Sequence, residues 1–268
     1  MGEISIDPKF NIHETYKKVR ILNPYRNASP IGGVDPDYQA VLDYASGNFI
    51  ALPDAAQQDI DNQFIINYKA SGAWDLDDVV LRFKGTATPA FKLICWKRRI
   101  EAQAFGGLTW SDSGVLGNGT TGYIDPLFIP ANGVKYTLND ASVAFSTFNI
   151  GTSGGNKTIA GSWSGANNGY ILIIPNNGGS SHLSINQFKT TTAYAKLGYT
   201  SVNRISSSLI SLDTTDITNS SGQLSTAKVY ILARSLNNTA DLFSDAGLGF
   251  ISFGASKRYV HDTVKILF

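Results

Sequence analysis

The sequence is poor in the residues that most often carry catalysis or bind metals. Its single cysteine, Cys95, excludes an internal disulfide framework and any site built from several cysteines. Its three glutamates (Glu3, Glu14 and Glu101) leave none beyond residue 101. The paired carboxylates of a glycosidase therefore cannot come from a Glu-x-Asp-x-Glu strand in the later part of the chain. We predict that the protein is not an enzyme.

Features that would indicate a membrane, a secretory route or nucleic acid are also missing. No run of ~18 apolar residues is present, so no membrane span is expected. The first residues lack the basic start and apolar stretch of a signal peptide. The net charge of +1 gives no reason to expect nucleic acid as a partner. The basic stretch at 97–99 is too short for a nucleic-acid patch and fits a solvated strand end.

Several short motifs resemble active-site patterns but lack an essential part. The segment "GSWSG" has Trp163 where a nucleophile elbow needs serine. The histidines, His13, His182 and His261, show no metal-ligand spacing and fit surface or hydrogen-bonded positions. The acidic "DLDD" at 75–78 fits the first turn of a helix better than a metal cluster. No cofactor is predicted, and calcium is not supported by a clear motif.

The composition of the chain changes near residue 105. Residues 1–35 show no sustained period and are predicted to form an extended arm. Residues 36–104 show helical periods and are predicted to form a small helical module with a connector. Its first helix ends near Gly47 and its second, opened by Pro53, ends near Gly72. The predicted buried stripes are Tyr38, Val41, Leu42 and Ala45 in the first helix and Ile60, Phe64, Ile65 and Tyr68 in the second.

The rest of this module is less regular. A third short helix is predicted within 74–85, with Leu76, Val79, Val80 and Phe83 facing inward. The segment 91–99 fits either a strand or a buried connector.

Residues 105–268 have a period of two. Twenty of the 26 glycines lie there, between short alternating runs such as "ASVAFSTFNI" and "YILIIP". Short strands separated by turns rich in glycine and asparagine indicate a mainly β domain, an antiparallel β-sandwich of the jelly-roll type.

The segment "GNGTTG" at 117–122 matches the dinucleotide-binding fingerprint, yet we predict that it binds no nucleotide. The fingerprint needs a helix directly after it, whose N-terminus receives the pyrophosphate. Pro126 and Pro130 prevent a regular helix there. The glycines are expected instead to form a tight turn before an edge strand.

The stretch "GVLGNGTTGYIDPLFIPANGVKYTLNDAS" resembles the opening of the concanavalin A-like, laminin-G-like jelly roll of bacteriophage and prophage structural proteins. The preceding "LPDAAQQ", "KASGAW" and "ICWK" resemble the same proteins, so the resemblance covers roughly residues 45–268. Cys95 stands where those proteins often have an acidic residue, so any function of that carboxylate is lost. The resemblance implies a virion component, such as a tail-fibre, baseplate or head-fibre protein.

Two alternatives to a purely structural virion protein remain open. The first is a carbohydrate-binding adhesin or receptor-binding module, and the second, less favoured, is a polysaccharide-degrading enzyme. Lectins of this architecture hold sugar through Asp, Asn and a stacking aromatic. The candidate glycan contacts are Trp163, Tyr170, Asp140 and Asn139, although aromatic residues in a sandwich more often belong to its core. The segment "NDAS" at 139–142 also fits a turn cap.

The predicted arm is the candidate assembly element. Its apolar residues, including Ile4, Phe10, Tyr16 and Tyr25, lie among charges without a period that could build a local core. Such a segment loses entropy when it becomes ordered, and contacts with a neighbouring protein can offset that loss. The expected partners are other virion proteins, further copies of the chain and host-surface glycans, and the expected location is the virion. Alternatively, the arm wraps its own β domain.

Overall fold

The computed structural model describes residues 33–152, 156–165, 169–177, 180–188, 190–192 and 196–268. Residues Val34–Phe268 form one compact unit. The predicted arm, with Ile4, Phe10, Tyr16 and Tyr25, lies outside the described residues except for its last positions. The predictions made for it therefore stay predictions.

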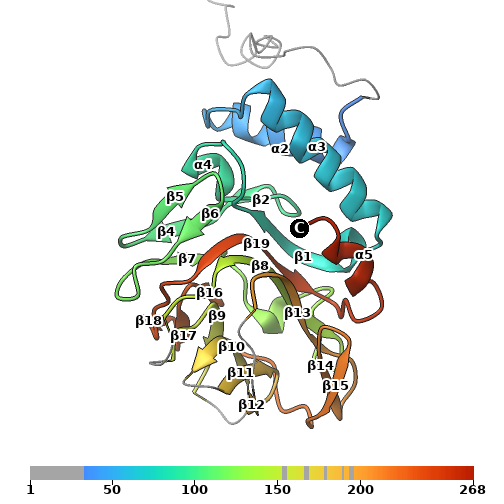
Figure 1. Ribbon diagram of the computed structural model, residues 1–268, viewed down its shortest axis with the longest axis vertical. Helices are drawn as coiled ribbons and strands as arrows, with labels where there is room; N and C mark the ends of the chain where they lie inside the picture. The colour runs from blue at the N-terminus through green and yellow to red at the C-terminus, as the bar shows by residue number, and fades with distance from the viewer. Residues whose placement is uncertain (1–32, 153–155, 166–168, 178–179, 189, 193–195) are drawn as a thin grey trace, which may run out of the picture. The chain divides into compact units, whose positions relative to one another are not determined.

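The described residues form an antiparallel β-sandwich (Figure 1). The eight-stranded sheet has the order β15-β14-β13-β8-β19-β6-β5, and β1 also pairs with β19. Its strands are β1 (Asp77–Arg82), β5 (Thr109–Ser111), β6 (Gly114–Leu116), β8 (Ala141–Asn149), β13 (Gly198–Arg204), β14 (Leu209–Leu212), β15 (Thr215–Thr218) and β19 (Gly247–Gly254).

The nine-stranded sheet has the order β12-β11-β10-β9-β16-β7-β4, with a hairpin of β17 and β18 attached to β9. Its strands are β4 (Gln103–Phe105), β7 (Tyr123–Asp125), β9 (Ala160–Trp163), β10 (Tyr170–Asn177), β11 (Ser180–Ile185), β12 (Thr190–Thr192), β16 (Tyr230–Ile231), β17 (Arg234–Leu236) and β18 (Thr239–Asp241). Only the β17–β9 pair is parallel among the described strands. A small separate sheet contains β2 (Ile94–Cys95) and β3 (Ile100–Glu101). The predicted mainly β class, with an antiparallel sandwich and a small helical module before it, is confirmed.

The two predicted helices exist, and their ends follow from their caps. Helix α2 (Pro36–Gly47) begins after Asp35, whose side chain accepts a hydrogen bond from the Asp37 amide, and it buries the predicted stripe. Helix α3 (Ala55–Ala70) is capped in the same way by Asp54. Its predicted stripe is wrong at one position. Ile60 is 56% exposed, whereas its neighbour Asp61 is buried.

The helix predicted within 74–85 is wrong. A 3-10 turn, η1 (Trp74–Leu76), leads directly into strand β1. Val79 and Leu81 face the core between the sheets, and Val80 faces the helices. A strand buried on both faces is apolar at successive positions, and such a run also fits a helical period.

The basic stretch at 97–99 is not a solvated strand end, because all three side chains bind other parts of the chain. Lys97 donates to the Trp74 carbonyl at 2.9 Å, and Arg98 donates to the Leu127 carbonyl at 2.9 Å. Arg99 pairs with Asp37 of α2. The three cations thus tie this turn to the helices and to the sandwich. The segment before it contains a short helix, α4 (Pro89–Lys92), and β2, so it is largely the predicted buried connector.

Two hydrophobic cores lie on opposite faces of the eight-stranded sheet. The larger core fills the sandwich and includes Val143, Phe145 and Ile251. The second core lies between the sheet and helices α2, α3 and α5 (His261–Lys265) and includes Tyr38, Tyr68 and Phe250. The helices therefore form a third layer (Figure 1). Because β1 and β4 belong to the sandwich sheets, the segments 36–104 and 105–268 are not separate compact units.

The segment "GNGTTG" forms a turn and is not followed by an α-helix. The Asn118 side-chain oxygen accepts hydrogen bonds from the amides of Thr120, Thr121 and Gly122 at 3.0, 2.9 and 2.8 Å. Gly119 has a φ of 74°, which favours glycine. The turn enters β7, which lies between β16 and β4, so the predicted edge position is wrong. Pro126 comes after the strand, and Pro130 opens the 3-10 turn η2 (Pro130–Asn132).

No helix in the described parts of the chain is both long and apolar enough to cross a membrane.

Candidate functional site

The outer face of the nine-stranded sheet carries two of the predicted glycan contacts side by side. Ile171 on β10 points into the sandwich core, so its neighbour Tyr170 points outward. Tyr170 pairs in register with Trp163 on β9. Their rings stack, with centroids 5.1 Å apart and an interplanar angle of 21°. Both side chains are half-buried, so each keeps part of its surface in contact with solvent.

Two more rings extend this pair across the sheet. Phe188, which is 46% exposed, packs its edge against Tyr170 with centroids 6.0 Å apart. The His182 ring on β11 lies 5.3 Å from Phe188. Burial lowers the pKa of His182 below its ordinary value of 6.5, which favours a neutral ring at neutral pH. We refer to Trp163, Tyr170, His182 and Phe188 as the Trp163 cluster.

A charged pair lies beside this cluster. The Arg234 guanidinium carbon is 5.2 Å from the Trp163 ring centroid, a cation–π contact. Arg234 Nε also donates to Asp241 Oδ1 at 2.8 Å, and its Nη2 contacts the other carboxylate oxygen. Gly161 makes this approach possible, because a Cβ there would lie 2.8 Å from the Arg234 Cα. Donors and acceptors therefore border a stacked aromatic surface.

A second aromatic group lies on the same outer face and was missed by sequence reasoning. Phe105 and Tyr123 are opposite each other on β4 and β7, and their rings stack at 4.7 Å and 13°. Tyr230 lies 4.7 Å from Tyr123, and Phe243 lies 6.1 Å from it. We call these four residues the Tyr123 cluster. The one local signal was that Tyr123 directly precedes the core residue Ile124 and so faces outward. The contact with Phe105 depends on the pairing of β4 with β7, which local sequence does not reveal.

The other two predicted glycan contacts are not part of either cluster. Asn139 and Asp140 are exposed and directly precede β8 of the other sheet. Asp140 Oδ1 accepts a hydrogen bond from the Ser256 amide at 2.7 Å, and the Asp140 carbonyl accepts one from the Thr137 amide at 2.8 Å. Because the Asp140 side chain binds an amide 116 residues away, it does not cap its own turn, and the turn-cap alternative for "NDAS" is wrong at this residue.

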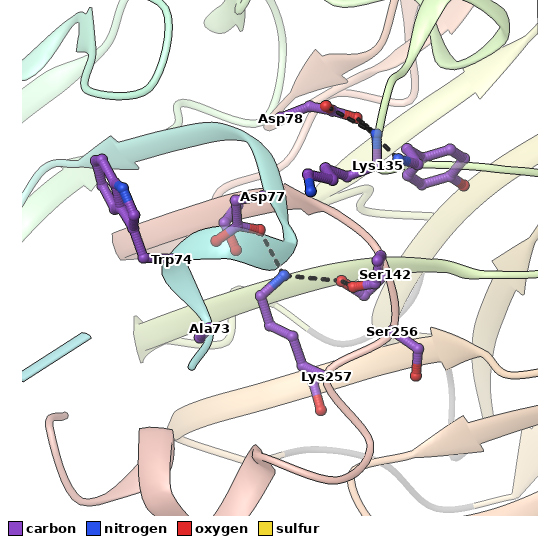
Figure 2. Close-up of polar contacts among 12 residues, drawn as sticks. Ala73, Trp74, Asp77, Asp78, Lys135, Ser142, Ser256 and Lys257 are labelled. Carbon is purple, nitrogen blue, oxygen red and sulfur yellow. Dashed lines mark hydrogen bonds and ion pairs between the residues drawn. The ribbon is translucent and has the colours of Figure 1, made fainter. Parts of the chain in front are cut away.

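A buried polar group lies on the helix-facing side of the eight-stranded sheet (Figure 2). Lys257 Nζ is 2.5 Å from Asp77 Oδ1, and both side chains are 0% exposed. Tyr68 donates its hydroxyl to Asp77 Oδ2 at 2.6 Å. Lys257 Nζ also donates to Ser142 Oγ at 2.9 Å. Burial raises the pKa of the Asp77 carboxyl, although the Lys257 charge opposes this.

The acidic segment at 75–78 does not begin a helix of the predicted kind. Asp77 starts β1, and Asp78 accepts hydrogen bonds from the Lys135 amide at 3.0 and 2.9 Å and from the Tyr136 amide at 2.8 Å (Figure 2). Within the described residues, no group of three or more His, Cys, Asp or Glu side chains could hold a metal ion.

Among the comparisons with known proteins, the search of solved structures is the one that found similar proteins. No protein-family model matches the chain, and no curated protein matches it. Domain 4 of AbnA, a GH43 extracellular arabinanase from Geobacillus stearothermophilus solved with arabinotriose, is 11% identical, with a TM-score of 0.44 over 68% of this chain and 99% of that one. The CBM40 of the Ruminococcus gnavus IT-sialidase is 8% identical, with a TM-score of 0.42 over 62% and 98%.

A mutant of the NanB sialidase from Streptococcus pneumoniae is 13% identical, with a TM-score of 0.40 over 59% of this chain and 27% of that one. The present chain therefore spans about a quarter of the NanB chain. At such low identities and TM-scores, these likenesses carry no argument about what this chain binds. None of the three is a bacteriophage protein, so the virion interpretation rests on the sequence resemblance alone.

Proposed function

We propose that this chain is a carbohydrate-binding module that contacts glycans through the outer face of its nine-stranded sheet. The observation that carries the proposal is the stacked, half-exposed pair of Trp163 and Tyr170, which is continued by the exposed ring of Phe188. A pyranose ring has an apolar face that packs on aromatic rings, and its hydroxyl groups need hydrogen-bond partners. Arg234 and Asp241 supply charged donors and acceptors beside Trp163.

The alternative for these rings is that they only stabilise the fold. The side chains that fill the sandwich from the same strands, such as Ile171 and Ala160, are 0% exposed. Phe188 instead leaves 46% of its surface in solvent while it contacts Tyr170. Exposed aromatic surface beside hydrogen-bonding groups favours recognition of a ligand over packing.

A second part of the proposal concerns the larger assembly to which the chain belongs. We propose that the chain is a bacteriophage virion component that uses the sandwich to contact host-surface glycans. The support is the resemblance of "GNGTTGYID" and "YTLNDAS" to phage structural proteins. Capsid, portal and tail genes beside its own gene would support this setting, and a neighbourhood of carbohydrate-metabolism genes would contradict it.

A glycan array with purified protein and a Trp163→Ala variant tests the binding proposal. We expect the wild-type protein to bind glycans, and the variant to lose affinity by about 10-fold or more, because rings at the centre of a contact carry much of its free energy. The melting temperature should change little, since Trp163 is half-buried.

The matched control is Trp110→Ala, which removes a half-buried Trp from β5 of the other sheet. Its glycan binding should equal that of the wild type. A wild-type protein that binds no glycan on the array contradicts the proposal. So does a Trp163→Ala protein that binds as well as the wild type. A large loss of stability in Trp163→Ala would place the ring among the core residues.

A further inference from the structure

The buried lysine–aspartate pair joins two parts of the chain that are far apart in sequence. Asp77 is the first residue of β1, and it lies opposite Gly254 at the end of β19. Lys257 follows three residues later, and the pair is separated by 180 residues. A bond between these side chains would therefore close a loop that contains nearly the whole sandwich.

We propose that Lys257 and Asp77 become covalently joined by an intramolecular isopeptide bond between Lys257 Nζ and Asp77 Cγ. The amine is already beside the carboxyl group, with Nζ 2.5 Å from Oδ1. Ser142 holds the amine from another side: its hydroxyl donates to the Ala255 carbonyl at 2.7 Å and accepts from Nζ at 2.9 Å (Figure 2). The two reacting groups are thus held in contact by the fold, which removes most of the entropic cost of bringing them together.

Burial raises the pKa of the Asp77 carboxyl, which favours the uncharged acid that the reaction needs. Both side chains are 0% exposed and lie beside the second hydrophobic core, so little water competes for the reacting groups. Transfer of one proton from Nζ to Oδ1 gives a neutral amine and a neutral carboxylic acid. An uncharged amine has the free electron pair that attack on a carbonyl carbon requires.

The bond changes then balance without any oxidant or further reactant. The Nζ electron pair attacks Cγ, and negative charge develops on Oδ2, which accepts the hydrogen bond of the Tyr68 hydroxyl at 2.6 Å. The Cγ–Oδ1 bond breaks, and the departing hydroxyl takes a second proton from the nitrogen. The products are an amide and one molecule of water. Tyr68 stabilises the charge on the intermediate, and Ser142 orients the amine.

Other ion pairs of the described residues show why this pair is singled out. Lys196 Nζ lies 2.6 Å from Asp213, and Lys228 Nζ lies 2.7 Å from Asp125, distances close to that of Lys257. Both of those lysine side chains are 35% exposed, so water reaches their amino groups and competes for the contact with the carboxylate. Among the ion pairs found in the described residues, only Lys257–Asp77 has both side chains at 0% exposure.

The mass of the full-length protein under denaturing conditions tests the proposal directly. We expect a mass lower by one water molecule than the sequence requires. Protease digestion should release the Asp77 and Lys257 peptides as one branched species. A wild-type protein with the full sequence mass, and with the two peptides released separately, overturns the proposal whatever the outcome of the glycan array.

Variants locate the bond. Lys257→Arg keeps a positive charge but presents no primary amine, so its denatured chain should have its full mass. Lys228→Arg is the matched control, and it should still lack one water molecule relative to its sequence. Loss of water that persists in Lys257→Arg overturns the assignment, because the bond would then lie elsewhere. If Tyr68→Phe forms the bond completely and at the wild-type rate, Tyr68 does not stabilise the charge on the intermediate.

Discussion

The two faces of the eight-stranded sheet are both buried, yet they are packed by different means. On the inner face, Val143 and Phe145 of β8 meet Ile251 of β19 in a core made of apolar side chains. On the helix-facing side, buried charges lie among aromatic rings: Arg82 pairs with Asp61, and Lys257 pairs with Asp77. Neighbouring residues of the same strands therefore enter two different environments.

The two faces differ in how strongly each one fixes the partner of every side chain. An apolar core accepts many arrangements of similar volume, so it stabilises the sandwich without fixing one partner for each side chain. A buried ion pair contributes little net stability, but it is costly to separate once it is desolvated. We infer that the inner core supplies most of the stability of the sandwich, and that the Arg82–Asp61 pair fixes where α3 lies on the sheet.

The largest effect is expected from breaking one polar pair on the helix-facing side. Arg82 Nε lies 2.7 Å from Asp61 Oδ1, and the two side chains are 6% and 3% exposed. Arg82→Met leaves the Asp61 carboxyl buried without its cation, which should lower the free energy of unfolding by about 3–5 kcal/mol. Urea denaturation followed by tryptophan fluorescence measures this change.

The double variant Arg82→Met/Asp61→Leu is the control for that experiment. Removing both partners leaves no orphaned charge, so much of the lost stability should return. If the double variant is as unstable as the single one, the loss comes from packing around Arg82, including its cation–π contact with Phe64 at 4.4 Å. The contrast between the two faces would then be wrong at this position.

A smaller effect is expected from trimming the inner face. Ile251→Val removes one methylene group from a 0% exposed side chain in the sandwich core. The expected loss is about 0.5–1.5 kcal/mol, measured in the same urea titration. A loss as large as that of Arg82→Met would show that the inner face depends on specific shape as strongly as the other face depends on paired charge.

The smallest effect is expected from acidification around His261. This ring, 2% exposed, shares a hydrogen bond with Ser201 at 2.9 Å, and burial lowers its pKa below the ordinary value of 6.5 while the Asp213 charge opposes the shift. Its contribution to stability is therefore present above pH 6.5 and is lost as the pH falls through that value toward the lower pKa of the folded state.

A His261→Gln variant should lose less stability than the wild type over the same acid range. Both proteins keep Asp61, whose raised carboxyl pKa acts in the opposite direction, so the difference between their curves isolates the histidine. Melting temperatures measured at a series of pH values give the two curves. Parallel curves would show that His261 does not contribute to the pH dependence.

Local patterns in the sequence predicted the elements with one apolar face and failed where both faces are buried. Helix α2 has a single stripe, and its buried residues are the predicted ones. In α3, the pattern favoured Ile60 over Asp61, because the partner that allows Asp61 to be buried, Arg82, lies on a strand 21 residues away. The same strand was mistaken for a helix, since its successive apolar residues serve two cores.

The candidate binding surface was predicted only in part, for a related reason. Trp163 and Tyr170 were proposed from residue type and position near turns, and the register of β9 and β10 brings them together. Phe105 and Tyr123 were not proposed, because their contact depends on the pairing of β4 with β7. Arg234 reaches Trp163 through the β17–β18 hairpin, another arrangement that no local period encodes.

The pairing of β1 with β19 determines how the sandwich would respond to a pulling force. The strands are antiparallel, and the ladder begins with Asp77 opposite Gly254, at the point where the chain enters β1 and leaves β19. Both flanking segments leave the ladder at this same end. Tension on them would therefore break the hydrogen bonds of the ladder one after another and not all together. Lys257 and Asp77 lie at the end of the ladder where this opening would begin. A covalent link there would therefore bear the force before any hydrogen bond of the ladder breaks.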